Sequence, residues 1–352
     1  MITSADKLYA TALETELPTI AQEVVATRPF QRLFGITHGG LKADPVHNNA
    51  FERLTASHNR GNHSMSVARL ANHLYNPDEL EVDRIHFVLG ALLHDLGHSA
   101  FSHFGELAFE NLCHKEFTED LILNDPELVA IWQKYCIDPK TILKIALEKT
   151  QGNPMTVKRD SGIISLDHLN NCLFDNFQRG GDLRAKKLAQ KLLSHTFIKR
   201  GIIYLEPGQE RLQTAFIRAS IKQNTDFVFG PKEIILEQIG IELVRKLHAA
   251  GLIQPEDLRR NQPYITKKIL SKDAKDIAPA EIKLLKETGP SLTAQECSQR
   301  VTKVLDPNEA SRVIDSAYLF SIPVYDQENP DPFTDLRRKI TGNYKIVLPY
   351  EN

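Results

Sequence analysis

The chain has 352 residues, of which 41% are hydrophobic and 25% are charged, so it is long enough to bury a sizeable core. The formal net charge of −2 at pH 7 provides no overall basic surface, and sequence-independent binding of nucleic acid would need a local patch that the composition does not supply. The four cysteines form no CxxC pair, no run of 18 apolar residues occurs, and the N-terminus lacks a signal-peptide core; we therefore expect a cytoplasmic protein with reduced thiols and no membrane segment.

Helical periodicity dominates the first half of the chain. Pro77 ends one long apolar helical pattern, and Gly97 ends the next. A polar stretch with Gly and Pro, residues 152–162, is typical of an exposed loop. Helices are expected over residues 5–26, 29–34, 63–75, 81–96, 102–113, 118–123, 140–149 and 163–177.

The pattern becomes mixed in the second half of the chain. Residues 200–206 have the apolar, β-branched character of a strand, and a turn at Pro207-Gly208 follows. Further helices are expected over 211–224 and 233–250, and further strands over 320–325 and 345–348. The prediction is a mostly α protein with a helical core, residues 1–250, and a smaller α+β C-terminal region, residues 251–352.

Histidines are concentrated in one part of the chain, since eight of the thirteen lie between residues 58 and 114. His94 and Asp95 are adjacent at the end of an apolar helix, where an imidazole and a carboxylate are costly to bury without compensation. A divalent cation would compensate both, and mixed His/Asp ligation suits Mn, Fe, Zn or Ni better than Ca. His63 opens the preceding long helix and Asp167 lies in another apolar helix, so a bundle of these helices would complete a ligand set.

Each of these residues also has a simpler explanation when it is taken alone. An isolated His94-Asp95 pair is more often a charge pair at a helix end, and His63 alone is an ordinary helix-start residue. Asp167 alone could pair with one of the arginines that follow it. The hypothesis of a metal site therefore depends on the four residues occurring together, in this order.

Three stretches resemble the HD-domain phosphohydrolases, and within them the branch of the deoxynucleoside triphosphate triphosphohydrolases. Residues 29–33 (Pro-Phe-Gln-Arg-Leu) look like the opening helix of that family. Residues 56–64 look like the loop that leads into its first metal histidine, and residues 91–106 match its HD helix and the following turn. The resemblance implies an HD-domain helical bundle, with the HD signature over residues 63–167, and a metal-dependent phosphohydrolase activity.

The resemblance also implies roles for individual residues. By it, the metal ligands are His63, His94, Asp95 and Asp167. The residues implied to act on the scissile phosphate are His98, His103, Glu106 and His114. Among these, a protonated His103 held by Glu106 would donate to the leaving oxygen, because imidazole titrates near working pH. Each of these histidines, taken alone, could instead be a solvated loop residue.

The implied substrate contacts depart from the triphosphohydrolase pattern. Arg60 falls where the family has a phosphate-contacting arginine, and Asp175 falls where it has a sugar-contacting acid. However, Asn171 replaces a tyrosine that packs on the sugar, and His168 replaces a basic residue. The family's Gln-Leu-Gly motif is replaced by His38-Gly39-Gly40. A smaller or differently shaped phosphate ester is therefore an alternative to a dNTP.

Three functions stay open from the sequence. The first is hydrolysis of a (deoxy)nucleotide, for example of a dNTP to deoxynucleoside and triphosphate, by a transition metal with Mg on the substrate phosphates. The second is a phosphodiesterase for a cyclic or oligonucleotide substrate, and the third is a nucleotide-binding regulatory protein with little turnover. By analogy with the family we expect a homo-oligomer without a membrane partner.

Overall fold

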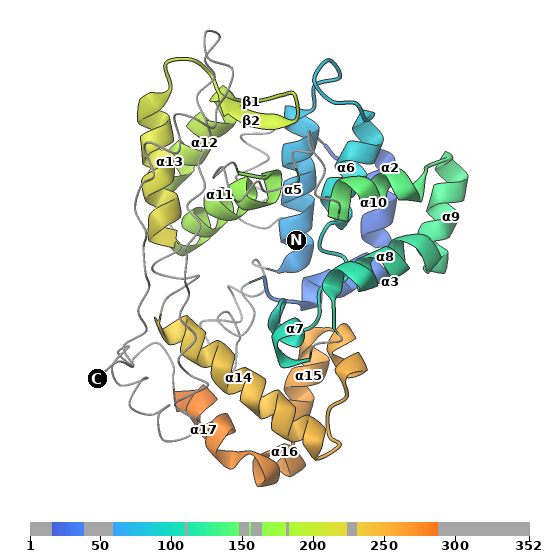
Figure 1. Ribbon diagram of the computed structural model, residues 1–352, viewed down its shortest axis with the longest axis vertical. Coiled ribbons are helices and arrows are strands. Elements are labelled where there is room, and N and C mark those ends of the chain that lie inside the picture. Colours follow the sequence, from blue (N-terminus) through green and yellow to red (C-terminus); the bar gives the residue numbers. More distant parts are fainter. Residues whose placement is uncertain are drawn as a thin grey trace.

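The computed structural model describes residues 16–38, 59–109, 112–147, 155, 164–180, 183–223 and 231–287. Within these ranges the regular secondary structure is helical apart from one two-stranded sheet (Figure 1), so the predicted mostly α fold is confirmed. Among the described helices, none combines the length and the apolar character that a membrane crossing requires. The loop predicted over residues 152–162 and the strands predicted over 320–325 and 345–348 lie outside the described ranges, apart from Met155.

Two helices form the centre of the molecule, α5 (Arg60–Leu74) and α6 (Arg84–Leu93). The side chain of Asn59 caps α5 by accepting from the Asn62 backbone N–H at 2.8 Å, and Asp83 caps α6 in the same way. Every residue from Phe87 to Leu93 is buried, which explains the broad apolar pattern of this segment. The helix ends at Leu93, earlier than the sequence indicated, so that His94 and Asp95 lie in the turn that follows it.

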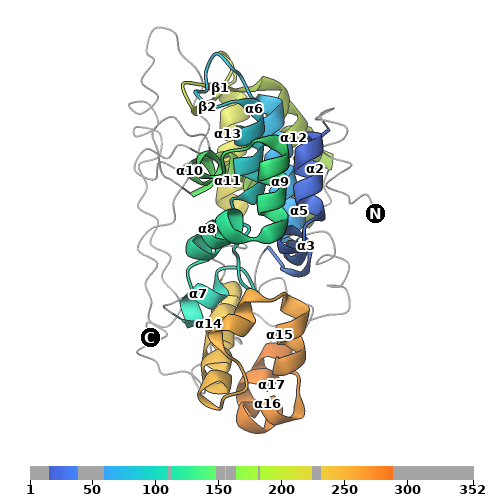
Figure 2. The same ribbon diagram turned by 90° about the vertical axis from the view of Figure 1, so that its right-hand side faces the viewer.

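One side of this central pair is covered by the N-terminal helices and by three later ones (Figure 2). They are α2 (Thr19–Ala26), α3 (Arg28–Gln31), the 3₁₀ helix η1 (Arg32–Gly35), α8 (His114–Asn124), α9 (Pro126–Tyr135) and α10 (Pro139–Leu147). They share one apolar core with α5 and α6, to which Leu33, Val88 and Trp132 belong. Helix α9 was not predicted, although Asp125 caps it and Pro126 occupies its first turn.

The other side of α5 is covered by α11 (Leu166–Gly180), α12 (Leu183–His195), α13 (Glu210–Gln223) and a β-hairpin. Strands β1 (Thr196–Lys199) and β2 (Ile202–Leu205) pair antiparallel, with Thr196 opposite Leu205. Strand β2 confirms the predicted β run, whereas β1 was not predicted. The hairpin is possible because Arg200 and Gly201 both take positive φ, 49° and 69°, in the two-residue turn.

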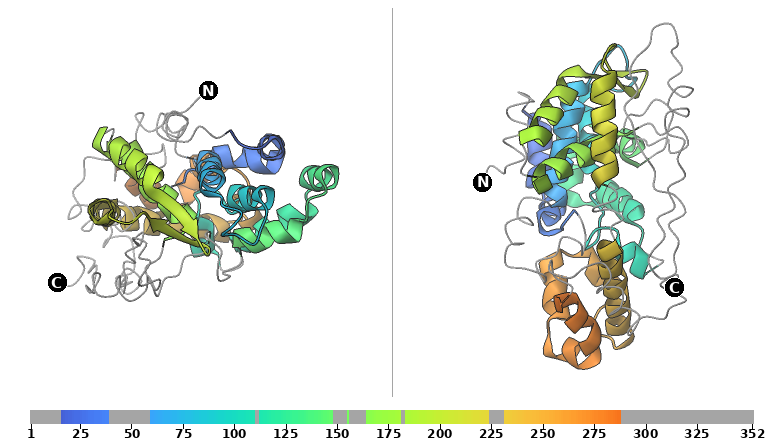
Figure 3. Two further views of the ribbon diagram at one scale, coloured as in Figure 1. Left: turned by 90° about the horizontal axis from the view of Figure 1, so that it is seen from above. Right: turned by 90° about the vertical axis from the view of Figure 1, so that its left-hand side faces the viewer.

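A second group of helices lies below these in Figure 1 and in the right panel of Figure 3, and has its own apolar core. It contains α7 (Phe104–Ala108), α14 (Pro231–Ala249), η6 (Pro255–Arg259), α15 (Gln262–Ile269), α16 (Lys272–Ile277) and α17 (Pro279–Glu287). Helix α7 is much shorter than the predicted helix over residues 102–113. The proposed division at residue 250 stays a prediction; α14, which precedes it, shares its core with the helices that follow.

Candidate metal centre and histidine cluster

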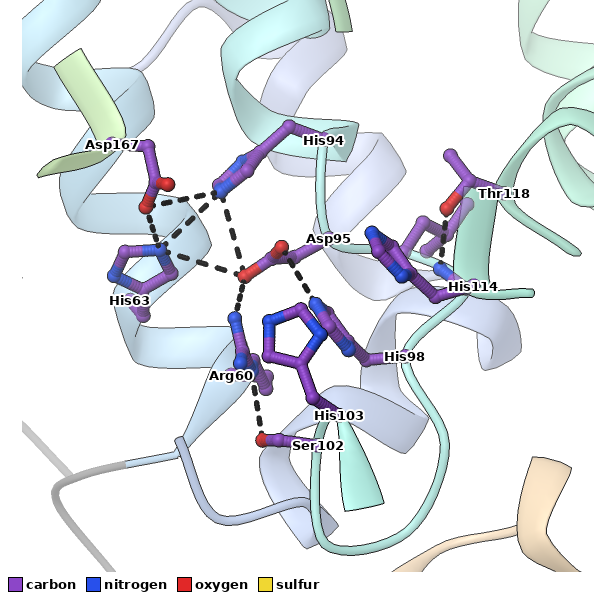
Figure 4. A network of polar contacts seen from close by, with 12 residues as sticks. Arg60, His63, His94, Asp95, His98, Ser102, His103, His114, Thr118 and Asp167 are labelled. Carbon is purple, nitrogen blue, oxygen red and sulfur yellow. Dashed lines mark hydrogen bonds and ion pairs between the residues drawn. The ribbon is translucent and has the colours of Figure 1, made fainter. Parts of the chain in front are cut away.

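The four predicted metal ligands come from three helices whose ends meet (Figure 4). His63 lies in the first turn of α5, His94 and Asp95 follow α6, and Asp167 lies in the first turn of α11. The Nε2 atom of His63 lies 3.3 Å from His94 Nε2, 3.1 Å from Asp167 Oδ1 and 3.5 Å from Asp95 Oδ2. The Nε2 atom of His94 lies 3.4 Å from Asp95 Oδ2 and 3.7 Å from Asp167 Oδ1. Four donor atoms from three segments therefore face one another.

These separations fit a shared metal ion. Four ligands at about 2.1 Å from a tetrahedral centre are about 3.4 Å apart, and the five distances above lie between 3.1 and 3.7 Å. Two imidazole nitrogens and two carboxylate oxygens form a donor set that suits a divalent transition metal. His63, His94 and Asp95 are buried, whereas the Asp167 side chain is 26% exposed, which leaves one side of the centre open. Three of the predicted ligands, His63, His94 and Asp167, thus form a group that could hold a metal, and Asp95 forms a second such group with His63 and His38.

The ionisable side chains of this centre shift one another's pKa values. Burial opposes ionisation of Asp95, but Arg60 and the neighbouring histidines outweigh it and hold the pKa of this carboxyl well below its usual range. The pKa of Asp167 is low for the same reason, with His63 and His94 as its partners. Burial lowers the pKa of His63, whereas at His94 the two carboxylates overcome burial and raise the pKa to about 9. The positive charge beside the two carboxylates comes from Arg60 and His94 in this structure, and a bound cation would supply more.

Arg60 lies inside this centre. Its Nη1 atom bonds Asp95 Oδ2, and its Nε atom donates to Ser102 Oγ at 3.0 Å. Ser102 Oγ in turn lies 2.6 Å from the carbonyl oxygen of Thr37. The arginine predicted to contact phosphate thus contacts Asp95, a predicted metal ligand, and its role toward a substrate stays a prediction.

A histidine cluster adjoins the metal centre through Asp95 (Figure 4). The Oδ1 atom of Asp95 lies 3.1 Å from His98 Nε2, while its Oδ2 atom faces His63 and His94. The His98 ring stacks on the His114 ring with centroids 4.3 Å apart. The His103 ring meets the His98 ring edge to face, with centroids 4.5 Å apart. Glu106 bonds Nδ1 of His114 and lies 3.1 Å from Nδ1 of His103, so one carboxylate holds two imidazoles. These hydrogen bonds outweigh burial and keep the pKa of Glu106 well below its usual range.

The loop that carries this cluster has an unusual backbone. Phe101 and Ser102 have φ angles of 63° and 62°, a left-handed conformation that costs roughly 1 kcal/mol or more for each non-glycine residue. The C-terminal helices stabilise the loop, because Phe101 is buried in their core and the Ala100 N–H donates to Leu258 O at 2.7 Å. This contribution of the C-terminal helices to the site was not predicted.

The remaining predicted contacts lie around the same centre. The His38 ring packs on His63, with centroids 4.1 Å apart. Asn171 donates to Asp167 Oδ1 at 3.0 Å, so it contacts the predicted metal ligand of its own helix. Asp175 belongs to α11, but its side chain lies outside the described part of the chain. Sequence reasoning missed Asn170, whose amide lies 3.0 Å from His63 Nδ1; its place three residues after Asp167 is the signal that could have found it.

Comparison with known proteins agrees with this geometry. Residues 60–199 match the HD domain family. The chain is 30% identical to YwfO of Bacillus subtilis (strain 168) over 242 residues, covering 66% of this chain and 53% of YwfO, so it spans about half of that relative. It is 26% identical to YdhJ of the same organism over 253 residues, covering 70% and 69% of the two chains. Both relatives are described as uncharacterized proteins.

The fold also occurs among solved structures. A crystal structure of a hypothetical protein from Aquifex aeolicus superposes with a TM-score of 0.56 at 20% identity, covering 76% of this chain and 72% of that one. At this identity the likeness shows the fold alone. The segment that matches the HD domain family, residues 60–199, contains all four residues that converge in the centre.

Proposed function

We propose that this protein is a metal-dependent phosphohydrolase that acts on a nucleotide or a related small phosphate ester. The observation that carries the proposal is the convergence of His63, His94, Asp95 and Asp167, with donor atoms 3.1 to 3.7 Å apart, inside an HD domain. HD domains in general are metal-dependent hydrolases. The identity of the substrate and of the physiological metal also belongs to the proposal.

The surrounding side chains support phosphate chemistry. A divalent metal held by the four ligands would polarise a phosphoryl oxygen and lower the pKa of a water molecule. Arg60 lies beside that position and would offset negative charge on the phosphoryl oxygens. His103 is held at Nδ1 by Glu106, and its side chain is 57% exposed, so its Nε2 is suited to donate a proton to the leaving oxygen.

The substrate side supports a compact ligand more than a dNTP. Asn171 replaces the sugar-packing tyrosine of the triphosphohydrolases, and here its amide is engaged with Asp167. His168, which replaces a basic residue, lies 3.1 Å from Ser165 Oγ and 3.5 Å from Asp167 Oδ2. Hydrolysis of a dNTP to deoxynucleoside and triphosphate therefore remains one form of the proposal, alongside hydrolysis of a smaller phosphate ester.

The test measures metal content and products together. Wild type, Asp167→Ala and His94→Ala are loaded with Mn²⁺, desalted, analysed for metal and incubated with dNTPs, NTPs and nucleoside monophosphates, and the products are separated by chromatography. We expect about one metal per chain in wild type, and loss of metal and of product in both variants, with His73→Ala, an exposed residue, as the control. Cleavage of bis-p-nitrophenyl phosphate without action on these nucleotides would favour a phosphodiesterase. Tight nucleotide binding without product would favour a regulatory protein.

A further inference from the structure

The two imidazole ligands differ in what holds the ring nitrogen that faces away from the centre. At His94, Nδ1 lies 2.8 Å from the backbone carbonyl oxygen of Ala91. A carbonyl oxygen can only accept a hydrogen bond, so Nδ1 of His94 carries a proton, and a metal bound to this ring would take the place of a proton on Nε2. At His63, the group facing Nδ1 is the side-chain amide of Asn170, at 3.0 Å from its Nδ2 atom.

Asn170 occupies a position where an apolar residue would be expected. Its side chain is fully buried in α11, and the residues on either side along the helix, Leu166, Leu169 and Leu173, belong to the apolar core. Burying an amide costs about 1 to 3 kcal/mol unless hydrogen bonds compensate it. Asn170 follows Asp167 by three residues, so the two side chains lie on one face of the helix. Helix α11 thus supplies one metal ligand and the neighbour of another.

The position of the His63 proton decides whether this residue can bind a metal. Nε2 is the atom that faces His94 and Asp167, and a metal needs its lone pair. The neutral ring must then carry its proton on Nδ1, which requires an acceptor at the place of the Asn170 amide. The oxygen and nitrogen of an amide are nearly the same size, so a half-turn about Cβ–Cγ places the oxygen where the nitrogen was. With the nitrogen facing Nδ1, the proton sits on Nε2 and blocks the centre; with the oxygen, the lone pair is available.

We propose that Asn170 is a positioning residue of the metal centre, and that in the metal-bound protein its side-chain oxygen accepts the Nδ1 proton of His63 and fixes the tautomer whose Nε2 binds the ion. This inference rests on the metal centre of the proposed function. Removing such a partner of a metal ligand typically lowers metal affinity 10- to 100-fold, because the ligand loses its orientation and its tautomer. A residue with a purely structural role would change stability and leave metal affinity in place.

The test compares two substitutions of similar size in the full chain. Asn170→Leu removes the acceptor, whereas Asn170→Asp offers oxygen atoms only. Affinity for Zn²⁺ is measured by competition with a chelating dye, and thermal unfolding is recorded in EDTA. We expect Asn170→Leu to bind Zn²⁺ about 10- to 100-fold more weakly than wild type, and Asn170→Asp to bind as tightly as wild type or more tightly. The absorption spectrum of the Co²⁺ form should be unchanged in Asn170→Asp.

Asp167→Ala separates failure of this inference from failure of the metal centre. If Asp167→Ala loses Zn²⁺ while Asn170→Leu binds it as wild type does, the role of Asn170 is wrong and the metal centre stands. If Asp167→Ala binds Zn²⁺ as wild type does, the ligand assignment fails and this inference fails with it. Should Asn170→Leu not fold, Asn170→Asp decides the matter, since a tenfold loss of affinity in a folded variant that keeps the acceptor overturns the proposal.

Discussion

Arg32 donates a hydrogen bond of 2.6 Å to the carbonyl oxygen of His98, which lies 66 residues further along the chain. The same guanidinium donates to Leu96 O at 2.6 Å and to Arg259 O at 3.1 Å. Burial lowers the pKa of Arg32 to about 10, and the side chain therefore stays charged at neutral pH. Through these three hydrogen bonds, Arg32 connects the turn that follows His94 and Asp95 to the C-terminal helices.

Replacing Arg32 should weaken the folded protein. Arg32→Met leaves the carbonyl oxygens of Leu96 and His98 without their charged donor, and we expect a loss of about 3 kcal/mol in the free energy of unfolding, because hydrogen bonds to charged groups are among the stronger ones. Arg32→Lys keeps the charge but cannot reach both carbonyls, so an intermediate loss is expected. Urea unfolding at pH 7 measures both. Equal free energies of unfolding for Arg32→Met and Arg32→Lys would contradict the role of the guanidinium group as a donor to both carbonyls.

Gly97 is expected to tolerate no side chain. A Cβ atom added there would lie 2.1 Å from His114 O and 2.4 Å from Thr118 N, both backbone atoms that cannot move aside easily. Gly97→Ala should therefore cost about 1 to 3 kcal/mol or more and displace the turn between Asp95 and His98. Chemical denaturation and metal content measure the two effects. Gly208→Asn is the matched control, because Gly208 has φ +82° in open space and asparagine tolerates that conformation.

The ion pairs of Glu106 should make stability depend on pH in the acid range. Its pKa in the folded protein lies below the ordinary value of 4.5, so the carboxylate stabilises the fold above pH 4.5 and loses this effect as the pH falls. We expect Glu106→Gln to have a lower melting temperature than wild type at pH 6, and the difference to shrink by pH 3. Glu119→Gln, at an exposed position of α8, is the control and should show no such trend. If the difference in melting temperature between wild type and Glu106→Gln grew toward low pH, a lowered pKa of Glu106 would be excluded.

Metal binding should stabilise the protein through the four ligands. A ligand that binds only the folded state adds about 2.7 kcal/mol at a concentration one hundred times its dissociation constant. We expect Mn²⁺ to raise the melting temperature of EDTA-treated wild type, and to leave Asp167→Asn unchanged because an amide is a far weaker ligand. His73→Ala, an exposed residue of α5, should respond as wild type does. A similar rise in Asp167→Asn would place the ion elsewhere.

Much of the candidate site could be predicted from the sequence because the signals are local. His94 and Asp95 directly follow an apolar helix, and this short segment is distinctive enough to be recognised without its neighbours. Helix periodicity likewise placed α5 and α6 to within a few residues. Helix α9 and strand β1 were missed, since their stability comes from packing against other elements: Trp132 of α9, for example, donates to Ile122 O at 2.9 Å and is buried in a core built by several helices.

By itself, the sequence determined the helical class, the candidate ligand residues and the segment that carries the His94-Asp95 pair. Only the tertiary structure decided which side chains lie around those ligands. Asn170 meets His63 across 107 residues, and Arg32 meets Arg259 across 227. The physical reason is that a metal centre at three helix ends is assembled by the burial of apolar helix faces, and neither the meeting of those ends nor the hydrogen bonds between them follows from local pattern.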